Sequence, residues 1–235
     1  MSCIKGLNKA TGIKLYSLKD KTYSTFFELL IDCKENAIGI ADLTILIKLN
    51  FFSEFGSIGK LLKFVEIYNE LYQKKTIKKD KEYLVKKLYL KEFCAKETEK
   101  QYTGFDSYKC LSSLIDKMAD EDISIKDKLL YQLQYFGYVD IVDTNINKDI
   151  WLVTDMVERS KNKIVDLYCI NNGKKIKAKV RSKVFTSNCF NKGDLLSIDS
   201  FMREGKWSIN PDTQEWEKST TVFENILNEY NIERN

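Results

Sequence analysis

Residues 163–181 read KIVDLYCINNGKKIKAKVR, and this stretch decides the expected fold of the C-terminal part. Asn172-Gly173 separates two strand-like runs and is the strongest short-range signal for a tight hairpin turn. The second run alternates, with Ile176, Ala178 and Val180 on one face. Its other face carries only cations: Lys175, Lys177, Lys179 and Arg181. The pattern predicts a half-buried strand with a basic outer face.

Strand-like segments continue on both sides of this hairpin. Residues 151–157 are rich in β-branched and aromatic side chains, and turn residues at 192–194 lead into residues 195–201. Glu204-Gly205 is expected to turn the chain again, and residues 223–230 favour a closing helix or, alternatively, a strand. Several short strands over about 70 residues are typical of a small closed barrel, of which the OB-fold is the commonest example.

The first part of the chain has helical periodicity. Thr25 and Glu28 form a Thr-x-x-Glu capping box, and apolar stripes around residues 43–51 and 58–72 recur at helical spacing. We therefore predict an α+β protein with three parts. These are a helical domain in residues 1–72, a lysine-rich helical connector in residues 73–137 and an OB-fold-like domain in residues 138–235. The lysines of the connector form either a solvated face or a surface that follows DNA.

Composition excludes several functional classes. Of the 235 residues, 43% are hydrophobic and 31% are charged, which is an ordinary globular balance. There is no membrane-length apolar stretch and no apolar signal run in residues 1–10, so a cytoplasmic location without membrane contact is expected. Histidine is absent, which excludes histidine acid-base chemistry. The scattered cysteines form no Cys-x-x-Cys pair, so the sequence predicts buried thiols, no metal site, no cofactor and no catalytic residues.

Three segments together resemble the C family of bacterial replicative DNA polymerases, the DNA polymerase III alpha subunits. Residues 4–10, IKGLNKA, resemble the hairpin of a helix-hairpin-helix motif, and residues 46–56, LIKLNFFSEFG, resemble the segment that ends that helical region. Residues 133–138, LQYFGY, followed by the expected barrel, are similar to the order of connector and OB domain in the family. The resemblance implies a C-terminal region that binds template or single-stranded DNA during DNA replication and lacks the catalytic palm.

The resemblance also implies a phosphate contact at the N-terminal hairpin. Helix-hairpin-helix hairpins bind a DNA phosphate through backbone N–H groups at two glycine positions, occupied here by Gly6 and Asn8. Asparagine tolerates left-handed geometry, but its side chain crowds the phosphate position. The candidate contacts are therefore Lys5, Gly6, Asn8 and Lys9, and the alternative is a purely structural turn.

Residues 132–136 resemble the short peptide by which such polymerases hold the sliding clamp. The candidate contacts are Gln132, Leu133, Tyr135 and Phe136. A clamp peptide has to be exposed and extended, whereas helical spacing with Leu129 and Leu130 favours Leu133 and Phe136 as core residues. Other replication proteins are further possible partners under the same resemblance.

An OB-fold would bind a single strand by charge and stacking. The basic row on residues 175–181 repeats every ~6–7 Å, close to the spacing of phosphates, and such contacts make affinity fall steeply with salt. The candidate stacking platforms are Trp151, Tyr168, Phe201 and Trp207. The alternative for the row is an ordinary solvated strand face whose lysines oppose aggregation.

A protein–protein interaction module, in a replication or another intracellular assembly, is the alternative function for the whole chain. It would differ from a DNA-binding region in having an exposed apolar patch and lysines spread evenly over its surface.

Overall fold

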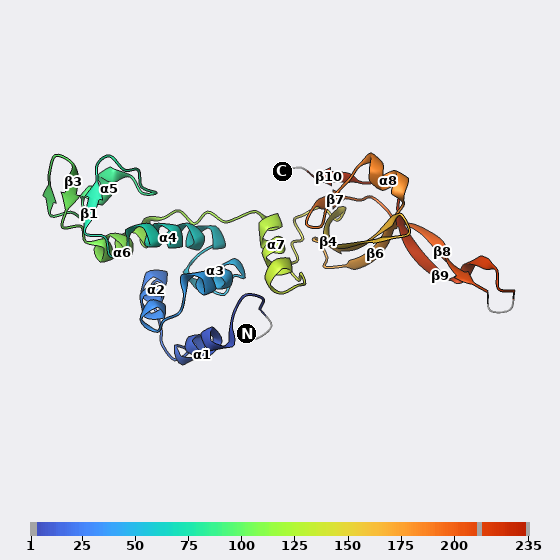
Figure 1. The fold of residues 1–235 in the computed structure, drawn as a ribbon, viewed down its shortest axis with the longest axis horizontal. Coiled ribbons are helices and arrows are strands. Elements are labelled where there is room, and N and C mark those ends of the chain that lie inside the picture. Colours follow the sequence, from blue (N-terminus) through green and yellow to red (C-terminus); the bar gives the residue numbers. More distant parts are fainter. Residues whose placement is uncertain (1–3, 211–212, 234–235) are drawn as a thin grey trace. The chain divides into compact units, whose positions relative to one another are not determined.

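The computed structural model describes residues 4–210 and 213–233. They form a mixed α+β structure that separates into two compact units, Met1–Tyr131 and Gln132–Asn235 (Figure 1). The division falls within helix α7 (Ile125–Tyr135). Neither unit is purely helical or purely β, because the N-terminal unit contains a small sheet and the C-terminal unit contains a helix between two strands.

The N-terminal unit begins with helices whose starts are set by local capping. In order these are α1 (Lys9–Ser17), α2 (Phe26–Glu35), α3 (Ile40–Lys48), the 3-10 helix η1 (Ser53–Phe55) and α4 (Ile58–Leu71). The predicted capping box of α2 is confirmed. The Glu28 N–H donates to Thr25 Oγ1 over 3.3 Å, and the Thr25 N–H donates to the Glu28 carboxylate over 3.4 Å. The cap explains why α2 begins at Phe26 and so directs its apolar face inward.

Residues 73–137 are only partly helical, which differs from the predicted helical connector. Strands β1 (Thr76–Lys78), β2 (Lys96–Glu97) and β3 (Gln101–Thr103) form an antiparallel sheet in the order β1-β3-β2. Helix α5 (Lys87–Lys91) lies between β1 and β2, and α6 (Ser107–Lys117) follows the sheet. Buried residues Ile77, Leu90 and Leu111 join the same core as the first helices, so residues 73–131 are part of the N-terminal unit and do not form a separate connector.

An acidic segment caps helix α4 from a distance in the sequence. The Ser57 N–H donates to Asp120 over 2.8 Å, and Ser57 Oγ donates to the Glu121 carbonyl over 3.0 Å. The hydrogen bond from the Ser57 backbone lowers the pKa of Asp120 below its usual value. We call residues 120–122 the acidic strap; it closes over the first turn of α4.

The ion-pair cluster around Asp32 predicts a pH dependence of stability. Its carboxylate accepts hydrogen bonds from Lys21 over 2.8 Å and from Tyr23, and the Lys21 bond is the main cause that lowers the pKa of Asp32. Burial, followed by the hydrogen bond to Asp32, raises the pKa of Tyr23 well above its usual value. The stabilisation from Asp32 is therefore complete above its ordinary pKa of 3.8 and is lost as the pH falls below it. The stabilisation from protonated Tyr23 is complete below its ordinary pKa of 10.0 and is lost as the pH rises above it.

Asp32→Asn should remove much of this pH dependence of stability at both acidic and alkaline pH. Urea denaturation followed by far-ultraviolet circular dichroism, at ~pH 3, ~pH 7 and ~pH 10.5, measures it. The matched control is Asp116→Asn, because Asp116 is exposed and pairs with no residue that the structure describes. If the urea midpoint of Asp32→Asn changed with pH as steeply as that of the control, the assignment of the pH dependence to Asp32 and Tyr23 would be wrong.

The C-terminal unit is built on a seven-stranded sheet. Its elements are β4 (Ile150–Arg159), β5 (Asn162–Cys169), β6 (Lys175–Val180), α8 (Ser182–Ser187), β7 (Leu195–Ser197), β8 (Met202–Ile209), β9 (Trp216–Leu227) and β10 (Asn231–Glu233). The hairpin predicted at Asn172-Gly173 is confirmed, with β5 and β6 antiparallel and Gly173 at φ +72°. Val165, Ala178 and Val180 of this hairpin are buried in the core of the unit, as the alternation predicts.

The strand order of the sheet is β10-β7-β4-β5-β6-β9-β8. Strand β9 pairs in parallel with β6, and after residues 228–230 the chain continues as β10, which pairs antiparallel with β7. Among the described residues, β8 and β10 are the two ends of the ladder, so hydrogen bonds do not close the sheet into the expected barrel. Strands β9 and β10 are nevertheless consecutive in the chain, so residues 228–230 connect the strand beside β6 to the strand beside β7.

Residues 202–227 differ from the sequence prediction. Glu204-Gly205 lies inside β8 and makes no turn, and residues 223–227 belong to β9, so the strand alternative is correct and the helix is wrong. Strands β8 and β9 pair antiparallel and form a long hairpin that projects beyond the rest of the sheet (Figure 1). A run of β-branched residues at 220–222 fits this extended conformation.

Candidate nucleic-acid interface

The basic row on β6 faces outward but is largely paired with carboxylates. Lys175, Lys177 and Arg181 are exposed and Lys179 is half-buried. Lys177 Nζ lies 3.3 Å from Asp166, Lys179 Nζ lies 2.9 Å from Glu224, and the Arg181 guanidinium pairs with Glu204. The partner carboxylates belong to β5 and β9, which flank β6, and to β8, the strand beyond β9.

These pairs reduce the charge that the row offers to phosphates. Lys175 has no carboxylate partner among the described residues, and its Nζ lies 6.0 Å from the centre of the Tyr168 ring. The unit Gln132–Asn235 contains equal numbers of basic and acidic side chains, so it has no net excess of positive charge. A partner held here by charge alone would therefore bind weakly at physiological salt.

The four predicted stacking platforms differ in exposure. Trp151 is 6% exposed and Tyr168 is 2% exposed, so neither ring face is accessible to a base. Phe201 is half-buried and packs edge-on against Trp151, with ring centres 5.2 Å apart. Trp207 is 48% exposed. Trp151 is buried in the core on the inner side of the sheet, whereas Tyr168 lies on the opposite side of β5, where its hydroxyl donates to the Ile141 carbonyl over 2.9 Å.

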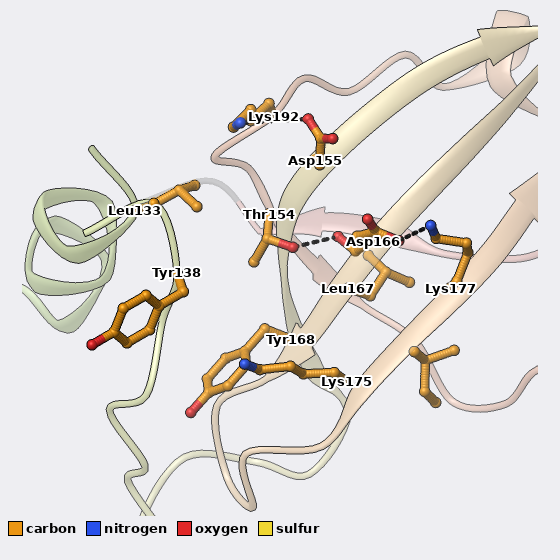
Figure 2. Close-up of a pocket in the computed structure, with 12 residues that line it drawn as sticks. Leu133, Tyr138, Thr154, Asp155, Asp166, Leu167, Tyr168, Lys175, Lys177 and Lys192 are labelled. Carbon is orange, nitrogen blue, oxygen red and sulfur yellow. Dashed lines mark hydrogen bonds and ion pairs between the residues drawn. The ribbon is translucent and has the colours of Figure 1, made fainter. Parts of the chain in front are cut away.

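A cleft of about 520 Å³ lies over the outer face of β4, β5 and β6 (Figure 2). Tyr138 and Leu133 line one side of the cleft, and Lys175 and Lys177 line the other. The Tyr138 ring is 51% exposed and stacks on Phe136 at 5.4 Å with an interplanar angle of 16°. The cleft therefore places an accessible aromatic ring opposite two lysines, which is an arrangement that can hold a base and its phosphate.

The β8–β9 hairpin carries the most exposed aromatic side chains of the unit. Trp207 pairs across the hairpin with Lys218, and Ile209 pairs with Trp216, so these four side chains share one face. Trp216 is 66% exposed, and Lys218 Nζ lies 5.7 Å from the centre of the Trp207 ring. This group of four residues is called the tryptophan face below.

Phe223 forms a second aromatic position nearer the base of the hairpin. It is 47% exposed, and the Arg203 guanidinium lies 5.1 Å from its ring centre. Sequence reasoning missed Trp216 because residues 213–222 were not expected to form a strand, and it assigned Phe223 to a closing helix or strand without considering it as a binding residue. The signal that was present is the proximity of a tryptophan and a lysine in each of two short segments, Lys206-Trp207 and Trp216-Glu217-Lys218.

The N-terminal turn has a structural role in the geometry observed. Gly6 adopts φ +85°, whereas Asn8 is extended at φ −84° and ψ 160°. The Asn8 side chain accepts the N–H of Thr11 over 2.8 Å and thereby caps α1. Lys5 and Lys9 are exposed on either side of this turn. The left-handed geometry considered for Asn8 does not occur, and phosphate binding by this turn stays a prediction.

The segment considered as a clamp peptide is helical through Tyr135. Leu133 lies in α7 and lines the cleft, and the Phe136 N–H donates to the Gln132 carbonyl over 2.8 Å. The Gln132 side chain donates to Asp140 over 2.6 Å and accepts the Asp140 N–H. A clamp peptide has to be extended, so the observed helix does not match that geometry.

Other chemistry is limited in the part of the chain that the structure describes. No group of three or more His, Cys, Asp or Glu side chains there could hold a metal ion. Cys33, Cys110 and Cys169 are buried as predicted, whereas Cys94 is half-buried and Cys189 is exposed, so the prediction is wrong for Cys189; Cys3 lies outside the described residues. Burial raises the pKa of Cys33 and Cys110 to about 12.

Over residues 4–210 and 213–233, no helix has the length and apolar character that crossing a membrane requires.

Comparison with protein-family models, curated proteins and solved structures gives no match to this chain.

Proposed function

We propose that the C-terminal unit binds single-stranded nucleic acid as an OB-like module, with bases stacking on the tryptophan face. The observation that carries this proposal is the exposure of Trp207 and Trp216 on one face of a projecting hairpin, with a lysine beside them. Base–aromatic stacking tolerates any sequence, because every base has a π-face.

The strand order supports the OB-like assignment. Strands β4, β5 and β6 form a meander, α8 follows, β7 pairs back on β4, and β9 runs parallel to β6 before continuing as β10 beside β7. A partly open five-stranded barrel has this connectivity when β9 and β10 are counted as one bent strand.

The positions of the cleft and the hairpin support the same function. OB-folds bind oligonucleotides on the face of their second and third strands and through the loops after the first and fourth strands. Here the second and third strands are β5 and β6, which line the cleft, and the loop after the fourth strand is replaced by the β8–β9 hairpin. Tyr138, Lys175 and the tryptophan face therefore occupy the expected binding regions.

The ion pairs change the expected salt dependence. Three cations on β6 and β8 pair with no carboxylate that the structure describes: Lys175, Arg203 and Lys206. The other three cations of the basic row, Lys177, Lys179 and Arg181, are paired. Contacts from two or three free cations predict a slope of log K against log salt of about −1.4 to −2 for a single strand. This slope is shallower than the steep one that an unpaired basic row would give.

A protein partner is the second candidate, and the hairpin also favours it. Ile209, Val222 and Met202 are exposed apolar side chains on the same two strands, and the unit has no net positive charge. An exposed apolar surface of this kind is typical of interaction sites. The proposal that the chain serves a DNA polymerase III alpha assembly rests on the sequence resemblance alone.

Fluorescence anisotropy of a labelled ~20-nucleotide single strand and of its duplex, at several salt concentrations, tests the proposal. We expect tighter binding to the single strand, with the shallow salt slope given above. Lys175→Ala should weaken binding, and the control Lys148→Ala, which removes the same charge from an exposed site outside the cleft, should not. Absence of binding to either DNA at low salt, or equal binding to both, would contradict single-strand binding and favour a protein partner.

A further inference from the structure

Residues 73–103 form a lobe of the N-terminal unit that contains the sheet β1-β3-β2 and helix α5 (Figure 1). This lysine lobe holds ten lysines and five acidic residues, an excess larger than the net charge of +4 of the whole chain. The unit Gln132–Asn235 contains equal numbers of basic and acidic side chains. The positive charge of the protein is therefore concentrated in the lysine lobe, outside the unit that carries the single-strand site.

Most lysines of the lobe are not neutralised by neighbouring carboxylates. Lys79 and Lys91 share the single carboxylate of Glu97, at 2.6 and 2.7 Å. Lys81 Nζ lies 3.5 Å from Glu70. The other seven form no ion pair with any residue that the structure describes: Lys74, Lys75, Lys78, Lys86, Lys87, Lys96 and Lys100. Because like charges repel, a surface of this kind is stabilised by an anion from outside the chain.

The small sheet arranges part of this charge on one face. Its antiparallel register places five side chains there: Thr76, Lys78, Lys96, Gln101 and Thr103. The opposite face carries Ile77, which is buried in the core, and Tyr102, which packs against the core, so the five side chains lie on the outer face. Lys78 and Lys96 are exposed, and no carboxylate, aromatic ring or aliphatic side chain of the three strands interrupts the outer face. We call it the lysine face.

The side chains of the lysine face match the backbone of a nucleic acid. Lysine, threonine and glutamine are among the residues that bind phosphate and sugar oxygens. The face offers no ring on which a base could stack, so it differs from the tryptophan face. A duplex keeps its bases stacked inside and presents about one negative charge per 1.7 Å of its axis, twice the density of one of its strands. The lysine face therefore suits a duplex better than a single strand.

Two neighbouring features bear on the strength and the kind of partner. Asp80 and Glu99 line a cleft at the tip of the sheet together with Lys78 and Lys100, and their charge opposes a phosphate, so binding should be weak. Leu84 and Leu88 are exposed on the segment between β1 and β2, outside the lysine face. A membrane surface would bind through such leucines together with the lysines, whereas the lysine face itself is wholly polar.

We propose that the lysine face binds the sugar–phosphate backbone of a nucleic-acid duplex without selecting its sequence. This proposal does not depend on the single-strand site, because the two surfaces belong to different units.

Fluorescence anisotropy of a labelled ~20-base-pair DNA duplex, titrated with the full-length protein at ~50–200 mM salt, tests the proposal. We expect a Kd of about 10⁻⁴ to 10⁻⁶ M at physiological salt, which is typical of backbone contacts. Contacts from three or four lysines predict a slope of log K against log salt of about −2.7 to −3.6. Lys78→Gln combined with Lys96→Gln should weaken duplex binding at least about tenfold at ~0.1 M salt and make the slope shallower by about 1.8. The same double variant should bind the single strand as the wild type does.

The matched control is Lys34→Gln combined with Lys63→Gln, which removes the same charge from exposed positions of α2 and α4. It should bind the duplex within about twofold of the wild type, and both double variants should keep the wild-type thermal midpoint, because all four side chains are exposed. No duplex binding at ~50 mM salt would overturn the proposal, whatever the result with the single strand. Equal losses in the two double variants would also overturn it, because net charge alone would then explain the binding. So would binding to phosphatidylserine vesicles that depends on Lys78 and Lys96 while the duplex does not bind, which would indicate a membrane surface.

Discussion

Gly59→Ala should destabilise the N-terminal unit by about 2–3 kcal/mol, although alanine is normally the better helix residue. Gly59 lies in the first turn of α4, directly under the acidic strap. A Cβ atom at this position would lie 2.4 Å from the Glu121 carbonyl oxygen and 3.2 Å from the Asp122 carbonyl carbon. Because these are backbone atoms, the strap would have to move, and the hydrogen bonds of Ser57 to Asp120 and Glu121 would be lost.

The two units can be followed separately in this experiment. All three tryptophans, Trp151, Trp207 and Trp216, lie in the C-terminal unit, so far-ultraviolet circular dichroism reports mainly on the helices of the N-terminal unit while tryptophan fluorescence reports on the other. Urea midpoints from circular dichroism should fall for Gly59→Ala and stay nearly constant by fluorescence.

A double-mutant cycle identifies the cause of the destabilisation. Asp120→Ala releases the strap, so Gly59→Ala should cost less in that background than in the wild type. The comparison variant Gly39→Ala places a Cβ 3.8 Å from its nearest neighbour, an ordinary contact, and should cost below about 1 kcal/mol. A neutral or stabilising effect of Gly59→Ala would show that the strap does not pack on α4 as described.

The parts of the fold that could be predicted depend on neighbouring residues. The capping box of Thr25 and Glu28 and the turn at Asn172-Gly173 each specify their geometry within four residues, and both are confirmed. The alternation of residues 175–180 likewise predicted which side chains of β6 are buried. These features need no knowledge of the rest of the chain.

The parts that could not be predicted depend on contacts between distant residues. The lysine-rich segment forms a sheet because β3 pairs with both β1 and β2, and a single strand of two or three residues carries almost no periodic signal. The β6 cations are paired with Glu224 and Glu204, which lie 45 and 23 residues along the chain from Lys179 and Arg181. An unbroken row of cations in the sequence therefore did not show that its charge is locally balanced.

The candidate site shows the same division. Alternation placed Trp151 and Tyr168 in strands, but only the packing of the unit shows that both rings are buried, Trp151 in the core and Tyr168 on the opposite side of β5. Trp207 was identified from its residue type, whereas Trp216 was missed because its strand forms only by pairing with β8. The binding surface now proposed thus lies on the hairpin more than on the basic row.

Replacing both Trp207 and Trp216 by alanine should lower the affinity for a single strand by at least about 30-fold. Each stacking contact contributes on the order of 1–3 kcal/mol, and the two rings lie on one face of the hairpin, where successive bases can reach both. The same anisotropy titration measures the loss. Ile209→Ala is the matched control, because it removes an exposed apolar side chain from that face without removing a π-surface.

The double variant retains Trp151 as its single tryptophan, and this ring is buried in the core of the C-terminal unit. An unchanged Trp151 emission maximum would show that the unit still folds, so that a loss of binding is attributable to the missing rings. If the folded double variant bound single-stranded DNA as tightly as the wild type, stacking on the hairpin would be excluded and the cleft around Tyr138 would be the remaining site. If Ile209→Ala weakened binding as much as the tryptophan changes, the face would act through its apolar area, which is the behaviour expected of a surface for a protein partner.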